Sequence, residues 1–224
     1  MLRGKAKYTV LCDFDGTVTN ADIGFCIIQE FAGEGWLEIE AAYQRGEKGS
    51  RQALEEIFTL TRVTEEKLCT FIDKNFFLDP YFPQFLEFCR QHGLPVTVLS
   101  DGFDFYIKRL FAGAGLTVPY LANTLRLKGS TLQAGFPHYN AVCGDCGNCK
   151  RNFARQVKAE GRKIIYIGDG FSDRCASAEA DILFAKGYLA DYCDSRKMPY
   201  FRFDSFADVL QHLQSGAVMR SEEG

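Results

Sequence analysis

Short apolar runs alternate along most of the chain with segments whose apolar residues recur at helical spacing. The runs predicted to form strands cover residues 8–12, 94–99, 163–167, 181–185 and 200–203. Helical spacing predicts helices over residues 83–92, 104–114, 151–160, 173–180 and 205–213. Near-continuous apolar strands that alternate with helices indicate an α/β fold, in which helices cover both faces of a parallel sheet.

Two segments interrupt this alternation. Residues 20–79 carry only helical spacing, for example at Ile23, Ile27 and Phe31, so we predict an all-helical insertion after the first strand. The predicted division is a core of residues 1–19 and 80–224 and a helical cap of residues 20–79. The cap would roof the carboxyl ends of the strands, where such sheets bind ligands. Residues 121–136, with Lys128 and Gly129 between two alternating stretches, predict a small hairpin.

Two aspartates one residue apart, Asp13 and Asp15, follow the first predicted strand directly. Strand side chains alternate with period two, so both carboxylates are expected on the same side at the end of the strand. Two unit charges about 4 Å apart repel by roughly 4 kcal/mol at an effective dielectric constant of 20. Such a pair needs a divalent cation, a shared proton or a looser geometry. The plainer alternative is a solvated turn in which one aspartate caps the following segment.

Further polar groups follow other predicted strands or begin predicted helices. They are Ser100-Asp101-Gly102, Gly168-Asp169-Gly170 with Ser172 and Asp173, and Lys150. The carboxyl ends of parallel strands meet at one edge of a sheet, so these groups are expected to join the two aspartates there. Together they supply a nucleophilic carboxylate, a second carboxylate, a hydroxyl with backbone amides, an ammonium group and further acids. That set of groups suits phosphoryl transfer.

Composition narrows the class of protein. The 224 residues are 46% apolar and 25% charged, which is typical of a globular protein. The formal net charge of -3 argues against a nucleic-acid or anionic-membrane partner, so we expect a small-molecule partner, no nucleic acid and no membrane. Arg3, Lys5 and Lys7 precede an apolar run too short for a signal peptide, and nine scattered cysteines fit a reducing compartment. The predicted location is the cytoplasm.

Four short motifs resemble those of the haloacid dehalogenase superfamily of aspartate-nucleophile phosphatases. In chain order they are Asp13-Phe14-Asp15-Gly16-Thr17, Ser100, Lys150 and residues 168–173. The resemblance covers most of the chain and implies a Rossmann-like three-layer core. The helical insertion between the first two motifs is similar to the first cap type of that superfamily, as in phosphoserine phosphatase. The implied activity is hydrolysis of a phosphomonoester through an aspartyl-phosphate.

The resemblance also implies roles for the acids. Asp13 would be the nucleophile, and Asp15 would be the general acid that protonates the leaving oxygen and later the base that activates water. Mg²⁺ would be held by the Asp13 carboxylate, the Asp15 backbone carbonyl and Asp169. Asp173 would be a further metal ligand or would orient one through water.

The same resemblance implies a phosphoryl-binding set. It consists of Ser100, the backbone amides of Asp101 and Gly102, and Lys150, which would stabilise the transferring group. Asp101 stands where phosphoserine phosphatases tend to have glycine, so its side chain is given no role. Ser172 replaces the asparagine that is usual in this motif, which leaves any substrate contact there open.

Residues 168–173, Ala180-Asp181, residues 184–189 and the cysteine-rich run before Lys150 are similar to a narrower group, the methionine-salvage phosphatases. Those enzymes act on 2-hydroxy-3-keto-5-methylthiopentenyl-1-phosphate. Phosphoserine and phosphocholine or phosphoethanolamine phosphatases share the same scaffold. The cap selects the substrate, so the resemblance leaves these substrates open. Within the insertion, Asp22 is expected to cap a helix rather than to bind a ligand.

Cys143, Cys146 and Cys149 form a run directly before Lys150. Their spacing fits part of a zinc site, whose fourth ligand the sequence does not place. Other interpretations are a reactive thiol cluster or small residues that pack a tight loop beneath Lys150. The run also carries a competing hypothesis from another class of function, a cysteine-centred zinc or redox module on a retained phosphatase scaffold.

Overall fold

The computed structural model describes residues 7–216. Within that range the chain forms a seven-stranded sheet in the order β4-β3-β2-β1-β5-β6-β7, in which only the β3–β4 pair is antiparallel. The strands are β1 (Tyr8–Cys12), β2 (Val96–Phe103), β3 (Tyr120–Lys128), β4 (Thr131–Gly135), β5 (Lys163–Gly168), β6 (Ile182–Ala185) and β7 (Phe201–Arg202). The α/β fold predicted from the sequence is confirmed.

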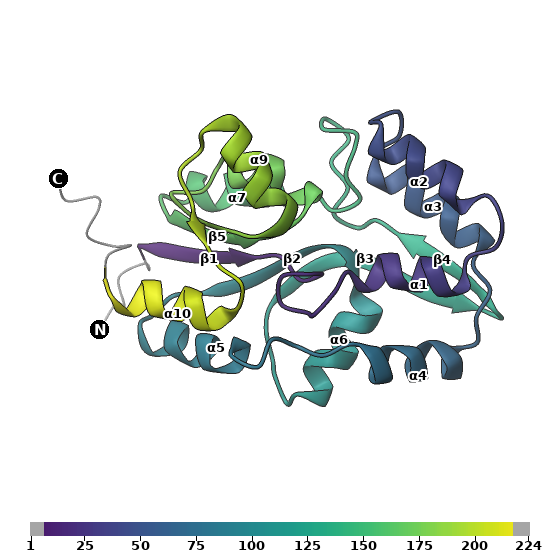
Figure 1. Ribbon diagram of the computed structural model, residues 1–224, viewed down its shortest axis with the longest axis horizontal. Helices are drawn as coiled ribbons and strands as arrows, with labels where there is room; N and C mark the ends of the chain where they lie inside the picture. The colour runs from purple at the N-terminus through teal and green to yellow at the C-terminus, as the bar shows by residue number, and fades with distance from the viewer. Residues whose placement is uncertain (1–6, 217–224) are drawn as a thin grey trace.

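Helices cover both faces of the sheet (Figure 1). One face carries α5 (Phe82–Gln91), α6 (Asp104–Gly113) and α10 (Phe206–Gln214), and the other carries α7 (Lys150–Ala159), α8 (Arg174–Ser177) and α9 (Gly187–Arg196). Successive side chains along each strand point to opposite faces of the sheet, so the core has two layers. In β1, Val10 and Cys12 pack with the first set of helices and Leu11 packs with the second.

The predicted elements differ from the observed ones in a few places. β2 continues past Leu99 to Phe103 through an irregularity in its pairing with β3, so Ser100 lies within the strand rather than after it. The predicted hairpin is present as β3 and β4, but β3 also pairs with β2 and extends the main sheet. The segment expected to be helical over residues 173–180 is a 3-10 turn (Phe171–Asp173) followed by the short α8. The spacing of apolar residues does not predict α9.

The insertion after β1 is helical. Residues 20–79 form α1 (Ile23–Phe31), α2 (Trp36–Gln44), α3 (Ser50–Leu60) and α4 (Glu65–Asn75), and no named strand lies among them. In Figure 1, α2 and α3 lie above the β3–β4 end of the sheet, and α4 lies below it near α6. Ile27, Phe58 and Ile72 of the insertion belong to the same buried cluster as Val10 and Phe103 of the sheet. The domain boundaries at residues 20 and 79 remain a prediction.

Residues 1–6 and 217–224, at the two ends of the predicted core, lie outside the described residues, and Arg3 and Lys5 are among them. None of the helices between residues 7 and 216 combines the length and the hydrophobicity that a bilayer-spanning segment needs. The cytoplasmic location remains a prediction.

Candidate active site

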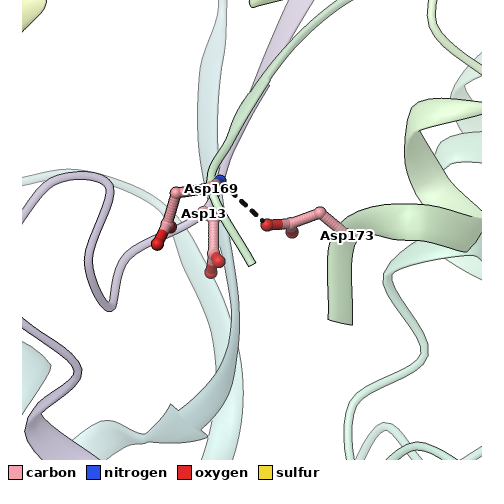
Figure 2. Close-up of side chains that lie close together, drawn as sticks. All are labelled: Asp13, Asp169 and Asp173. Carbon is pink, nitrogen blue, oxygen red and sulfur yellow. Dashed lines mark hydrogen bonds between the residues drawn. The ribbon is translucent and has the colours of Figure 1, made fainter. Parts of the chain in front are cut away.

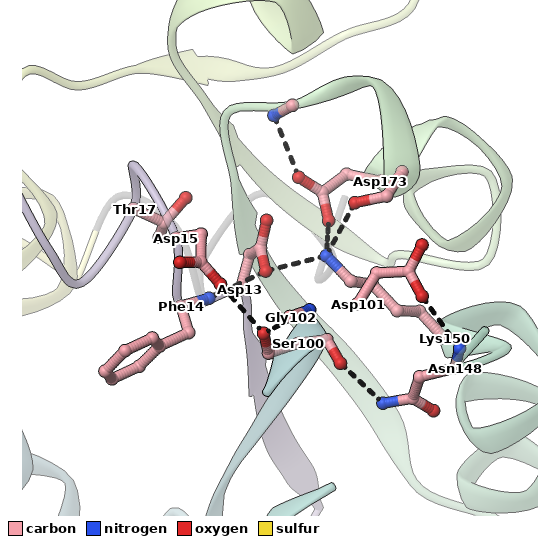
Figure 3. Close-up of polar contacts among 12 residues, drawn as sticks. Asp13, Phe14, Asp15, Thr17, Ser100, Asp101, Gly102, Asn148, Lys150 and Asp173 are labelled. Atoms are coloured by element: carbon pink, nitrogen blue, oxygen red, sulfur yellow. Dashed lines mark hydrogen bonds and ion pairs between the residues drawn. The ribbon is translucent and has the colours of Figure 1, made fainter. Parts of the chain in front are cut away.

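The sequence motifs meet at the carboxyl ends of the central strands. β1 lies between β2 and β5, so Asp13 after β1 lies beside Asp169 after β5. The backbone amide of Asp13 donates to the carbonyl of Ile167 at 2.9 Å, which extends the β1–β5 pairing by one residue. Lys150 begins α7 and Asp173 ends the 3-10 turn after β5. Both side chains point back toward Asp13 (Figure 3).

Three carboxylates converge at this point (Figure 2). Asp13, Asp169 and Asp173 place oxygens within 4.8 Å of one another, and the part of the chain that the structure describes holds no second such group of metal-ligating side chains. The Lys150 ammonium group lies 2.7 Å from Oδ1 of Asp13 and 2.7 Å from Oδ1 of Asp173. Asp13, Lys150 and Asp173 are buried, so these charges interact away from bulk water.

The buried charges in this cluster do not balance, because three carboxylates face one ammonium group. Burial and the neighbouring Asp173 raise the pKa of Asp13, and the same two causes raise the pKa of Asp169 to about 6. For Asp173, burial acts to raise the pKa, but contacts with Lys150 and Tyr166 hold it below its usual value. A divalent cation with oxygen ligands would restore the balance, so the residues present fit Mg²⁺.

Hydrogen bonds hold these acids in place. The Tyr166 hydroxyl donates to Oδ1 of Asp173 at 2.6 Å, and the backbone amide of Asp169 donates to Oδ2 at 3.2 Å. The Thr17 hydroxyl donates to the Asp169 carboxylate and so ties the loop after β1 to the end of β5. Gly16 has a φ of 72°, and a Cβ there would lie 2.4 Å from Oδ2 of Asp169. This position therefore requires glycine.

Asp15 has different partners from Asp13. β1 ends at Cys12, and the side chains of Asp13 and Asp15 both line the cavity while they contact different groups. Oδ2 of Asp15 accepts hydrogen bonds from the Tyr106 hydroxyl at 2.9 Å and the Ser100 hydroxyl at 3.0 Å, and Oδ1 accepts from the Ile23 amide at 3.1 Å. Burial raises the pKa of Asp15 to about 7, which suits a group that gives and takes a proton.

Ser100 and Gly102 lie at the irregular part of β2. The Gly102 amide donates to the Ser100 hydroxyl at 2.8 Å (Figure 3). A Cβ at Gly102 would lie 1.8 Å from the hydroxyl oxygen of Tyr106 and 2.3 Å from Oδ2 of Asp15. Glycine at this position therefore leaves space for the contact between Tyr106 and Asp15.

A cavity of about 530 Å³ lies above the acids and below α1, α2 and α3. We call the strand ends with Asp13, Asp15 and Asp169 its floor. We call the cavity-facing side chains of the three helices its roof. The roof is mostly apolar and includes Phe25, Ile28, Tyr43, Leu54 and Ile57.

Additional carboxylates face the cavity. Asp22, Glu40 and Asp101 line it, whereas no Lys, Arg or His is among the described residues that do so. Asp22 also accepts a hydrogen bond from the Phe25 amide at 2.8 Å and caps α1, as expected from the sequence. The cavity above the floor is therefore apolar and acidic.

The cysteine run lies apart from the three aspartates, and among the described residues its thiols do not converge as closely as those carboxylates do. Cys143, Cys146 and Cys149 are free thiols, and the metal-ligating side chains that converge are the three aspartates. Burial, together with the neighbouring cysteines, raises the pKa of Cys146 and Cys149. The zinc or redox module remains a prediction, because Cys143, Cys149 and Cys175 all lie near enough to Cys146 to affect its pKa.

Several residues that hold the site belong to no motif. Tyr106 and Tyr166 lie in segments that resemble an ordinary helix and a buried strand. Ser50 and Asn148 contact Asp101 from 51 and 47 residues away along the chain. The sequence signal that could have pointed to Tyr106 and Tyr166 is a tyrosine in an apolar segment, because a buried tyrosine hydroxyl needs a hydrogen-bond partner.

Comparison with known proteins gives a consistent result. The haloacid dehalogenase-like hydrolase family matches residues 10–178. Two relatives are named 2-hydroxy-3-keto-5-methylthiopentenyl-1-phosphate phosphatase. The one from Exiguobacterium sp. is 28% identical over 208 residues (92% of this chain, 96% of the relative), and the one from Bacillus velezensis is 30% identical over 211 residues (92% and 89%). A solved structure titled phospho-aspartyl intermediate analogue of phosphoserine phosphatase has a TM-score of 0.68 at 22% identity, covering 94% of this chain and 99% of that chain.

Proposed function

Since the chain belongs to the haloacid dehalogenase-like hydrolase family and is a phosphoric monoester hydrolase, we propose that it works in two steps through an aspartyl-phosphate on Asp13, with Mg²⁺. The observation that carries this proposal is the position of Asp13. Its carboxylate lies at the floor of the cavity, 2.7 Å from the Lys150 ammonium group and beside Asp169 and Asp173. A carboxylate in this position can attack a phosphoryl group whose charge its neighbours offset.

In the first step, an oxygen of Asp13 attacks phosphorus and the bond from phosphorus to the leaving oxygen breaks. Asp15 gives its proton to that oxygen, so the product leaves as an alcohol. In the second step, water attacks the phosphorus of the aspartyl-phosphate and Asp15 takes a proton from that water. Inorganic phosphate leaves and Asp13 is free again. The groups that bind the phosphoryl oxygens in both steps are Ser100, the amides of Asp101 and Gly102, and Lys150.

Asp13, Asp169 and Asp173 would hold Mg²⁺, together with the backbone carbonyl of Asp15. The supporting observation is the excess of carboxylates around the single Lys150 ammonium group. When bound, the ion supplies positive charge that offsets the charge on the phosphoryl oxygens.

We propose 2-hydroxy-3-keto-5-methylthiopentenyl-1-phosphate, named for the relatives, as the first candidate substrate. Its leaving group carries no charge and ends in an apolar methylthio group. The side chains of Ile28, Leu54 and Ile57 in the roof suit such a group, because apolar pockets bind apolar surface without loss of hydrogen bonds.

Phosphoethanolamine or phosphocholine is the second candidate. Asp22, Glu40 and Asp101 place carboxylates at the cavity, and these would attract an ammonium group on the substrate. Phosphoserine ranks below both, because its carboxylate would face the same acids. The described residues that line the cavity offer it no Lys, Arg or His.

Asp13→Asn tests the nucleophile. The change keeps the size of the side chain, so we expect a folded protein whose Mg²⁺-dependent phosphate release falls on the order of 10⁴-fold. Wild-type enzyme quenched with acid during turnover should carry one phosphoryl group on the peptide that contains Asp13, as read by mass spectrometry. Appreciable metal-dependent turnover by the variant, or a label on another residue, would contradict the assignment.

A substrate panel tests the choice of leaving group. We expect kcat/KM to fall in the order methylthiopentenyl phosphate, phosphoethanolamine, phosphoserine, measured with Mg²⁺ on one enzyme preparation. p-Nitrophenyl phosphate serves as the control for active enzyme. A preference for phosphoserine would overturn the argument from the charges of the cavity.

A further inference from the structure

The Asp101 carboxylate lies beside the cavity and connects segments that are far apart along the chain. Oδ2 of Asp101 accepts a hydrogen bond from the Ser50 hydroxyl at 2.6 Å, and Oδ1 accepts from the Asn148 backbone amide at 2.8 Å. The side-chain amide of Asn123 donates to the Asp101 backbone carbonyl at 2.6 Å. Asp101 therefore links β2, the first residue of α3, β3 and the loop of residues 136–149.

The Ser50 hydroxyl completes this connection. It also accepts a hydrogen bond from the Gly147 amide at 3.1 Å, so the hydroxyl acts as donor and acceptor at the same time. Ser50 and Asn148 are 8% and 2% exposed, and buried polar groups of this kind are costly to leave without partners. We call Ser50, Asp101, Gly147 and Asn148 the junction.

Two glycines allow the close approach at the junction. A Cβ at Gly49 would lie 2.3 Å from the carbonyl oxygen of Asp145, and one at Gly147 would lie 2.7 Å from the ring of Phe136. The Arg51 amide donates to the Asp145 carbonyl at 3.3 Å. The start of α3 thus contacts the backbone of the loop directly.

The same loop leads to the proposed phosphoryl-binding groups. The side-chain amide of Asn148 donates to the backbone carbonyl of Ser100 at 2.9 Å and to that of Leu121 at 2.8 Å. Lys150 follows two residues later, where its ammonium group contacts Asp13 (Figure 3). A shift of the loop would therefore move both Ser100 and Lys150.

We propose that the junction couples docking of α3 over the cavity to the placement of Lys150 and Ser100, with Asp101 as the positioning residue. This inference rests on the proposed function. When α3 is docked, Ser50 satisfies Asp101 and Gly147 and the loop holds both phosphoryl-binding groups. When α3 moves away, an acceptor on Asp101 and the Gly147 amide lose their partner and the loop loosens. Phosphoryl transfer is thereby confined to the covered cavity.

Ser50→Ala tests the coupling, because alanine keeps α3 helical and removes only the hydroxyl. With acetyl phosphate, whose small leaving group does not reach the roof, we expect kcat to fall about tenfold, as for the loss of one hydrogen bond to a charged group. Ser50→Thr keeps a hydroxyl and should restore kcat. Gln52→Ala, which removes an exposed partner of Glu56 from the same helix, is the matched control. Asp101→Asn should lower kcat in the same direction as Ser50→Ala.

Amide hydrogen exchange gives a measurement independent of turnover. We expect faster exchange across residues 147–152 in Ser50→Ala than in wild type or Gln52→Ala, with Mg²⁺ and inorganic phosphate present. Faster exchange at Gly147 alone, or an unchanged kcat with acetyl phosphate, would overturn the coupling. Failure of the proposed function is a separate outcome, wild-type enzyme without Mg²⁺-dependent hydrolysis. The exchange measurement would then still test the junction.

Discussion

In the floor of the cavity, charged side chains have charged or hydrogen-bonding partners within the protein, whereas the roof presents mostly apolar surface and the carboxylate of Glu40 to the cavity. Lys150 contacts Asp13 and Asp173, and Tyr166 donates to Asp173. In the roof, Ile28 and Leu54 offer only shape and hydrophobicity to a ligand. Under the proposed function, this difference assigns cleavage of the phosphate ester to the floor and selection of the leaving group to the roof.

Apart from Asp13→Asn, the largest effect is expected from Lys150→Met, which disrupts the floor. It leaves Asp13 and Asp173 buried without their common cation, so we expect a loss of about 3–5 kcal/mol in the free energy of unfolding. We also expect kcat to fall on the order of 10³-fold. Urea unfolding with and without Mg²⁺ would measure the first effect, and Mg²⁺ should recover part of it. Lys158→Met on the exposed side of α7 is the control, and equal losses in both variants would contradict the role of the buried cation.

Asp15→Asn should separate the general-acid role of Asp15 from the nucleophile role of Asp13. Without a proton donor, we expect kcat for an alkyl phosphate to fall about 100-fold. The first step with p-nitrophenyl phosphate should change little, because that leaving group departs without a proton. Burst kinetics would separate this step from hydrolysis of the aspartyl-phosphate. Equal losses in the first step for the two substrates would remove the general-acid role.

Mg²⁺ should stabilise the floor and leave the roof unchanged. At a free Mg²⁺ concentration ten times its Kd, we expect about 1.4 kcal/mol of added stability in wild type. The gain should be smaller in Asp169→Asn, as read by chemical unfolding. Metal analysis after dialysis is the companion measurement. Stoichiometric zinc, with no response to Mg²⁺, would favour the cysteine-centred module instead.

Phe25→Ala should produce the smallest effect, confined to the roof. Phe25 is 36% exposed and makes an edge contact with Trp36, so we expect a stability change below about 1 kcal/mol. KM for a substrate with an apolar leaving group should rise about threefold, while kcat with acetyl phosphate stays unchanged. A large fall in that kcat would show that roof and floor are not separable at this position.

The centre of the sheet was predictable because β1, β5 and β6 are buried on both faces. A short continuous apolar run such as residues 163–167 is typical of a strand that is covered on both faces. α9 was not predictable in the same way, since its apolar and polar residues are mixed around the helix. The role of β3 was missed because a hairpin pattern says nothing about pairing with a distant strand.

The acids of the floor were predictable from motifs and from the topology that gathers strand ends. Their partners were not, because Ser50 reaches Asp101, and Tyr106 reaches Asp15, only through the tertiary fold.

The insertion and the sheet share one apolar cluster. This limits how substrate specificity can be transferred between relatives by exchanging segments. The Val63 amide donates to the Ser130 carbonyl at 2.9 Å, and Arg62 forms an isolated bridge with Thr131, so the insertion is joined to the β3–β4 hairpin. A chimera that exchanged residues 20–79 alone would set foreign side chains against Leu132 of that hairpin. The unit of exchange for protein engineering is therefore the insertion together with residues 120–135.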